Sequence, residues 1–217
     1  MAPAQPLPPL IDDPRRSQHI AAMAKLSNRE KILREGLKVV DEVGFSSASV
    51  RSIVSAAGVP LGSFTNHFVS KEAFGLEIVE LYFANSQNVV LDTLRNDAKP
   101  PLMRLREYIA GSRSKGSCGG PLGGLLGSFI AETGVAGDAI RQRVNEIVAG
   151  LTDAVAYCIE AAVKAGEVAP DIDCRQVAGF IVSSHQGAVL LSKSQRSPEP
   201  IERLETVLFS IVLRPLH

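Results

Sequence analysis

The stretch at residues 58–74, GVPLGSFTNHFVSKEAF, decides how the N-terminal part of the chain folds. Gly58 can adopt the positive φ that a sharp turn between two helices needs. Pro60 is tolerated in a first helical turn, because the amide hydrogen it lacks would have no partner there. Phe64 and Phe68 are four residues apart, so on a helix they share one face, which we expect to point toward the core. The stretch therefore predicts a sharp turn and then a short helix anchored by two aromatic rings.

Helical patterns lie on both sides of this stretch. Ser27 followed by Glu30 is typical of a capping box, and apolar residues recur at three- and four-residue steps as far as Gly44. Ser49 can cap a second helix, VRSIVSAA, and Ser70 can cap a longer one over residues 71–94. The glycine-containing turn between the second and third predicted helices makes residues 49–68 a helix-turn-helix.

The short third helix carries small and amide-bearing side chains beside its two phenylalanines. Thr65 and Asn66 can hydrogen-bond the edges of bases, and the methyl group of Thr65 can pack on a thymine methyl. The whole chain has 23 basic and 23 acidic residues, so its net charge gives no general attraction to nucleic acid. DNA binding would therefore depend on a few placed cations and on helix N-termini.

The run SVRSIVSAAGVPLGSFTNHFVSKEAF resembles the DNA-binding signature of the TetR family of bacterial repressors, and the similarity extends over residues 27–82. The resemblance implies an all-α protein. It would have a DNA-binding domain at residues 27–87 and a C-terminal helical domain for ligand binding and dimerisation at residues 88–217. The resemblance assigns contacts with bases or phosphates to Arg51, Ser63, Thr65, Asn66, His67 and Lys71.

Two positions depart from the family pattern: Thr65 stands where tyrosine is usual and Leu61 where lysine is frequent, so an aromatic phosphate contact is missing. The resemblance implies a homodimer that spaces two recognition helices by about 34 Å to read a palindromic operator. Binding of a small, largely apolar or electrophilic inducer would release the repressor from DNA. The alternative is a ligand-independent activator or architectural DNA-binding protein.

The C-terminal two-thirds of the chain also has a helical pattern. Helices are predicted over residues 101–115, 121–132, 138–166, 173–195 and 199–216, with Asp171 or Asp173 as the cap of the fourth. Small residues on that fourth helix and an apolar stripe on the last one, which includes Leu208, predict a four-helix interface between two subunits.

A glycine-rich turn precedes the helix predicted at residues 121–132. Its glycines either serve core packing alone or leave room beside the helix for a small molecule. His185 is a satisfied core or interface histidine, or else a residue in the wall of such a pocket. The residues predicted to bind the ligand are Tyr108, Cys118, Leu125, Phe129, Tyr157 and His185.

Cys118 has a further possible role. In the drug- and electrophile-responsive branch of the family, a similar stretch often reads GCPLGNL, whereas this chain has GGPLGGL, with Gly120 in place of the cysteine. Cys118 precedes a predicted helix start and follows Arg113 and Lys115, which would favour the thiolate. It is either a sensor of electrophiles or an ordinary loop thiol.

Other features exclude several classes of protein. Three widely spaced cysteines argue against a disulfide framework and for a reducing cytoplasm. No Cys or His pair has the spacing of metal ligands, so we predict no metal site and no cofactor. Cys174 and His185 lie about three turns apart on one predicted helix and cannot form a catalytic dyad within one chain, so we predict no enzyme. Charges and glycines interrupt the apolar stretches, so no membrane span is expected.

Residues 1–26 are rich in proline and contain Arg15 and Arg16. They are predicted to form an extended or disordered arm. This arm is either an inert tail or a basic segment that touches the DNA backbone.

Overall fold

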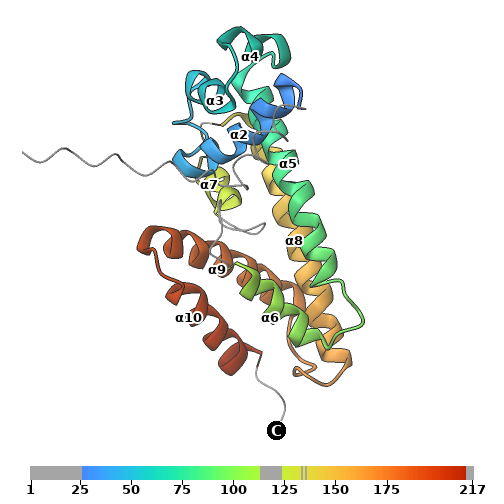
Figure 1. Cartoon of the computed structure of the whole chain (residues 1–217). Helices are drawn as coiled ribbons and strands as arrows, with labels where there is room; N and C mark the ends of the chain where they lie inside the picture. The colour runs from blue at the N-terminus through green and yellow to red at the C-terminus, as the bar shows by residue number, and fades with distance from the viewer. Residues whose placement is uncertain (1–25, 113–123, 133, 135, 214–217) are drawn as a thin grey trace, which may run out of the picture.

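The computed structural model describes residues 26–112, 124–132, 134 and 136–213. The predicted N-terminal arm and Cys118 lie outside these residues. The described part of the chain is all-helical, as predicted, and Figure 1 shows its arrangement. The elements are α2 (Asn28–Val43), α3 (Val50–Ala57), α4 (Leu61–His67), α5 (Lys71–Asp92), α6 (Pro101–Gly111), α7 (Leu125–Glu132), α8 (Asp138–Lys164), α9 (Cys174–Gln195), α10 (Glu199–Val207) and the π-helical turn η1 (Leu208–Val212).

Side-chain caps fix the starts of four of these helices. At α2 the capping box is present: Ser27 Oγ accepts from the amide of Glu30, whose carboxylate accepts from the amide of Ser27 at 2.8 Å. Ser49 and Ser70 cap α3 and α5 through single amide contacts of 3.0 Å. Of the two candidates for the cap of α9, Asp173 is the one that accepts backbone hydrogen bonds.

Helices α2, α3 and α4 form a small bundle at one end of the molecule, together with the first turns of α5 (Figure 1). Phe64 and Phe68 are buried there against Phe74, with ring centroids 5.1–5.3 Å apart, which confirms their predicted core position. Gly58 ends α3 with φ of +65°, in the left-handed region, as the sharp turn requires.

The other helices form the body of the protein. Helices α5 and α8 run side by side along its length, α6 and α9 pack on α8, and α10 packs on α9 (Figure 1). The predicted domain boundary between residues 87 and 88 falls inside α5, which continues to Asp92. Helix α7 and the first turns of α8 pack into the same apolar cluster as the N-terminal bundle. The bundle and the body are therefore joined by packed side chains as well as by α5.

Several predicted helices differ from the structure in their bounds. Helix α5 ends at Asp92 instead of residue 94, and α8 ends at Lys164 instead of residue 166. The last predicted helix is α-helical only to Val207 and continues as a π-helical turn to Val212, with the amide of Leu213 donating to the carbonyl of Leu208 at 2.8 Å. Helix α6 ends at Gly111, before the predicted end at residue 115.

Candidate DNA-reading surface and ligand cavity

The exposed face of α3 and α4 carries most of the residues predicted to contact DNA. Arg51, Asn66 and His67 are exposed, and Arg51 forms no ion pair with another described residue. Thr65 is also exposed, and its hydroxyl donates to the carbonyl of Gly62 at 3.1 Å. Because the hydroxyl already has this backbone partner, the methyl group is the part of Thr65 best suited to meet a base.

Two other predicted DNA contacts are engaged within the protein. Ser63 is half-buried, and its hydroxyl oxygen accepts from Asn28 Nδ2 at 3.3 Å. Lys71 Nζ donates to the carbonyl of Ser46 at 3.0 Å and lies 4.9 Å from the ring centroid of Phe45. Partial burial lowers the pKa of Lys71, and the nearby carboxylate of Glu132 opposes that shift. Lys71 therefore braces the turn between α2 and α3, a contact that sequence reasoning missed.

Glu132, the last residue of α7, binds the same turn. Its carboxylate accepts from the amides of Phe45 at 3.1 Å and Ser46 at 2.6 Å. Gly44 has φ of +85°, and a Cβ atom there would lie 2.4 Å from Glu132 Oε1, so the backbone and the carboxylate approach closely. Helix α7 is thus attached to the segment that leads directly into α3.

Two further polar contacts join helices of the body to α2 and to α5. Lys193 Nζ, on α9, donates to the carbonyl of Asp41 on α2 and lies 3.4 Å from its carboxylate. Arg143, on α8, donates to the carboxylate of Glu80 on α5 at 2.9 Å, and this contact raises the pKa of Arg143.

A cavity of about 430 Å³ lies in the body. Its volume falls within the roughly 300–1,000 Å³ that is usual for small-molecule sites. Most of its wall is apolar. The lining residues are Tyr82, Phe83, Ser86, Gln87, Val90, Leu91 and Arg95 from α5 and the residues after it, Tyr108 from α6, Leu126 from α7, Ile147, Gly150, Leu151 and Ala154 from α8, and Gln186 from α9.

The structure separates the residues predicted to bind the ligand. Tyr108 lines the cavity, and the buried ring of His185 lies behind it with the two centroids 5.3 Å apart. Leu125 and Phe129 pack instead in the cluster of the N-terminal bundle, and Leu126 is the lining residue from α7. The helical period predicts that the apolar residues of α7 are buried. It does not predict which of them pack against the N-terminal bundle and which line the cavity.

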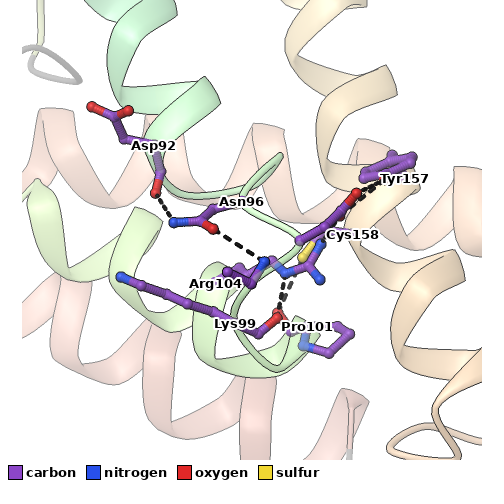
Figure 2. A network of polar contacts seen from close by, with 9 residues as sticks. Asp92, Asn96, Lys99, Pro101, Arg104, Tyr157 and Cys158 are labelled. Atoms are coloured by element: carbon purple, nitrogen blue, oxygen red, sulfur yellow. Dashed lines mark hydrogen bonds and ion pairs between the residues drawn. The ribbon is translucent and has the colours of Figure 1, made fainter.

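Tyr157 lies outside the cavity lining, contrary to the sequence prediction. Its hydroxyl donates to the carboxylate of Asp97, in the segment between α5 and α6, at 2.8 Å. Arg104 donates to the same carboxylate at 2.6 Å. It also donates to the carbonyl of Lys99 at 2.6 Å (Figure 2). These contacts fix the segment between α5 and α6 against α8. The hydrogen bond from Tyr157 also lowers the pKa of Asp97.

The two described cysteines are poor nucleophiles. The thiol of Cys158 donates to the carbonyl of Pro101 at 3.1 Å (Figure 2), and burial raises its pKa to about 11. Burial also raises the pKa of Cys174. A raised pKa lowers the thiolate fraction near pH 7, which makes both thiols less reactive toward electrophiles than an exposed cysteine.

Several buried polar atoms lie where α6 meets α9. His185 Nε2 is 2.7 Å from the hydroxyl oxygen of Ser112, and burial lowers the pKa of His185 to about 4, so the ring is neutral at pH 7. Among the described residues, no hydrogen-bond partner is found for Tyr108 Oη, His185 Nδ1 or Gln186 Oε1. Such unpaired atoms are unusual in protein interiors.

An apolar strip is formed by exposed side chains of α9 and of η1. Phe180 and Leu191 on α9 are 49% and 51% exposed, and Ile211 in η1 is 67% exposed. Leu208, which the sequence placed in this strip, is only 1% exposed and belongs to the core of its own chain. The prediction of an exposed Leu208 was wrong because the stripe on the last helix is broad enough to face both the core and the outside.

Two kinds of site are absent from the described part of the chain. None of its helices combines the length and apolar character needed to cross a membrane. Within the same residues, no three His, Cys, Asp or Glu side chains are grouped so that they could hold a metal ion.

Comparisons with known proteins give consistent matches over most of the chain. Residues 32–78 match the family model described as bacterial regulatory proteins, tetR family, and residues 101–208 match the Tetracyclin repressor-like, C-terminal domain. The chain is 34% identical over 191 residues, 88% of its length and 95% of the relative's, to the HTH-type transcriptional repressor DhaR of Mycobacterium sp. strain GP1.

Two further proteins are similar over most of the chain. The transcriptional regulator AcuR of Cereibacter sphaeroides is 28% identical over 201 residues, 92% of each sequence. The crystal structure of regulatory protein TetR from Rhodobacter sphaeroides superimposes with a TM-score of 0.74 and 26% identity, covering 83% of this chain and 96% of that one.

Proposed function

Because the chain belongs to the TetR family of bacterial transcriptional regulators, we propose that it is a homodimeric repressor that reads a palindromic operator and is released when a small, largely apolar molecule fills its cavity. A DNA-binding repressor is the function that the family and its named relatives support. Residues 27–87 would bind DNA, and residues 88–217 would bind the ligand and the second subunit.

One observation carries the ligand-controlled part of this proposal. Helix α7 contributes Leu126 to the wall of the cavity and, at its other end, holds the turn before α3 through Glu132. A ligand that displaces Leu126 would therefore shift the support of the helix-turn-helix. Release from DNA requires only that the ligand bind the released conformation more tightly than the DNA-bound one.

The apolar strip on α9 and η1 supports a dimer. Phe180, Gly187 and Leu191 follow one another at steps of seven and four residues, so they share a face of α9. Two copies of such a face are self-complementary under twofold symmetry. The dimer would place two copies of α4 at the spacing of successive major grooves, about 34 Å.

The alternative, a DNA-binding protein without a ligand, is less well supported. A mostly apolar cavity of about 430 Å³ beside the linking helix α7 has no role in that function. Among the described cysteines both thiols are poorly reactive, so the described residues favour a noncovalent ligand over an electrophile.

The DNA-reading part is tested by selecting bound fragments from genomic DNA and measuring affinity by fluorescence anisotropy. Asn66→Ala should weaken binding to the selected site by roughly 1–3 kcal/mol and relax the preference at one base pair. Asn145→Ala removes the same side chain from an exposed position on α8 and should bind as wild type does. Unchanged affinity and preference in Asn66→Ala would mean that Asn66 does not contact a base.

A further inference from the structure

Two residues that line the cavity, one on α6 and one on α9, each contain a buried polar atom without a partner among the described residues, and both side chains would turn to present these atoms to a ligand. Tyr108 on α6 is 1% exposed and Gln186 on α9 is 8% exposed, and both line the cavity. Tyr108 Oη and Gln186 Oε1 are buried and have no hydrogen-bond partner among the described residues. A buried polar atom of this kind costs stability unless something else completes its hydrogen bond.

The other polar groups of the wall are engaged or exposed. The hydroxyl of Ser86 donates to the carbonyl of Tyr82 at 2.9 Å, and Gln87 is exposed. Among the lining residues, Tyr108 and Gln186 therefore contain the buried polar atoms for which the described residues provide no hydrogen-bond partner.

We infer that the cavity selects neutral molecules with one hydroxyl group on an apolar body, held by Tyr108 and Gln186. The hydroxyl oxygen would accept a hydrogen bond from Tyr108 Oη, and its proton would be donated to Gln186 Oε1. A hydroxyl supplies both an acceptor and a donor in one small group, which a purely apolar molecule cannot do. This inference rests on the proposed function, in which the cavity is the effector site.

The charges around the cavity argue against an ionic ligand. Arg95 is the charged side chain among the lining residues, and its guanidinium lies 4.4 Å from the ring centroid of Tyr157. The hydroxyl of that tyrosine binds Asp97, and Arg95 helps to lower the pKa of this carboxyl. The charge of Arg95 therefore lies near the carboxylate of Asp97, which it helps to keep ionised.

The group behind Tyr108 is also uncharged. His185 packs against the ring of Tyr108, and burial lowers its pKa to about 4, so it offers no positive charge to an anion at neutral pH. An ammonium ion would have no carboxylate among the lining residues. Either ion would lose its hydration without full compensation.

The test is isothermal titration of the purified full-length protein with four probes that share one ring: benzyl alcohol, toluene, benzoate and benzylammonium. Benzyl alcohol should bind more tightly than toluene by on the order of threefold to tenfold, the gain expected from one or two hydrogen bonds. Both ions should bind more weakly than the alcohol. Toluene binding as tightly as the alcohol, or benzoate binding more tightly, would overturn the inference, and the second result would point to Arg95.

Two variants assign the preference to residues. Tyr108→Phe and Gln186→Met should each reduce the preference for benzyl alcohol over toluene while leaving toluene binding intact. Tyr157→Phe removes a hydroxyl that lies outside the lining and should keep the wild-type preference. If Tyr108→Phe does not fold, Gln186→Met still tests the inference. A Gln186→Met protein that keeps the wild-type preference for benzyl alcohol over toluene would refute the role of Gln186.

Measuring DNA binding on the same preparation separates this inference from the proposed function. Specific DNA binding without binding of any of the four probes would overturn the ligand chemistry and leave DNA recognition standing. Binding of the alcohol in a protein that recognises no specific DNA would refute the repressor and leave the chemistry of the cavity standing.

Discussion

At position 185 an imidazole lies fully buried against the ring of Tyr108, with one nitrogen bound to Ser112. The surroundings offer no carboxylate to stabilise the charged ring, and burial alone lowers its pKa. The folded protein therefore resists protonation at a pH at which an unfolded chain would accept a proton.

This difference predicts a loss of stability in mild acid. With a pKa of about 4 in the folded state and 6.5 in the unfolded one, the unfolded chain binds more protons between these values. The contribution of His185 to the free energy of unfolding is intact above pH 6.5 and decreases as the pH falls toward 4. Between pH 7 and pH 5 it should lower the free energy of unfolding by roughly 2 kcal/mol. Urea denaturation at a series of pH values measures the change.

Two variants show whether His185 is the source. His185→Gln should remove most of the pH dependence between pH 7 and pH 5. His67→Gln, which changes an exposed histidine, should keep it. An equal pH dependence in wild type and His185→Gln would contradict the assignment.

Sequence reasoning at the scale of single residues succeeded where local spacing decides the outcome. Phe64 and Phe68 had to share a face of a short helix, and they are buried as predicted. The position of Tyr157 could not be predicted, because its partner Asp97 lies 60 residues away in the chain. Helical spacing gives a direction around one helix and does not identify the group on the facing segment.

Among the helices, α7 has the position best suited to couple ligand and DNA. It has eight residues, contacts the cavity through Leu126 and reaches the turn after α2 through Glu132. Two backbone amides share its terminal carboxylate, and a carboxylate accepts such bonds more strongly than a neutral amide does.

Glu132→Gln should therefore weaken the attachment of α7. The glutamine oxygen can replace one acceptor but its NH₂ group cannot accept, so an amide of the turn loses its partner. We expect a loss of about 1–2 kcal/mol in the free energy of unfolding, and less release of DNA by a cavity ligand. Urea denaturation and ligand titration of the DNA complex measure the two effects.

Glu160→Gln, at an exposed position on α8, is the matched control and should change neither quantity. If Glu132→Gln is as stable as wild type and is released from DNA by the same ligand concentration, the link through Glu132 carries no coupling.

The starts of the helices were readable from the sequence because a cap and its partner lie within three residues, as Ser27 and Glu30 do. The contact between Glu132 and Ser46 spans 86 residues and has no such local signal. The same holds for the cavity, whose wall combines residues from five helices.

At the scale of the whole molecule, the apolar strip of Phe180, Leu191 and Ile211 lies on the outside of the protomer. We expect it to be covered by a second copy of the chain. An exposed apolar strip along two helices is costly to leave in water.

Ile211→Glu should yield a folded monomer, because the side chain is exposed in the protomer and its charge would be buried only in the dimer. Analytical ultracentrifugation should show half the wild-type mass, with the helical circular dichroism retained. Operator affinity should fall because a monomer contacts one half-site only.

Met103→Glu introduces the same charge at an exposed position on α6 and should leave the mass and the affinity unchanged. Leu208→Glu is expected to impair folding itself, since Leu208 is buried in its own chain. An Ile211→Glu protein that remains a dimer and binds the operator normally would place the interface elsewhere.

The composition of the cavity wall gives the protein an optical reporter of its own. The chain contains no tryptophan and three tyrosines, of which Tyr82 and Tyr108 line the cavity. Its ultraviolet emission therefore originates from phenol rings, two of which a bound molecule would touch. Replacing Tyr157 by phenylalanine would remove the third emitter, and the remaining fluorescence would report occupancy of the cavity without any attached dye.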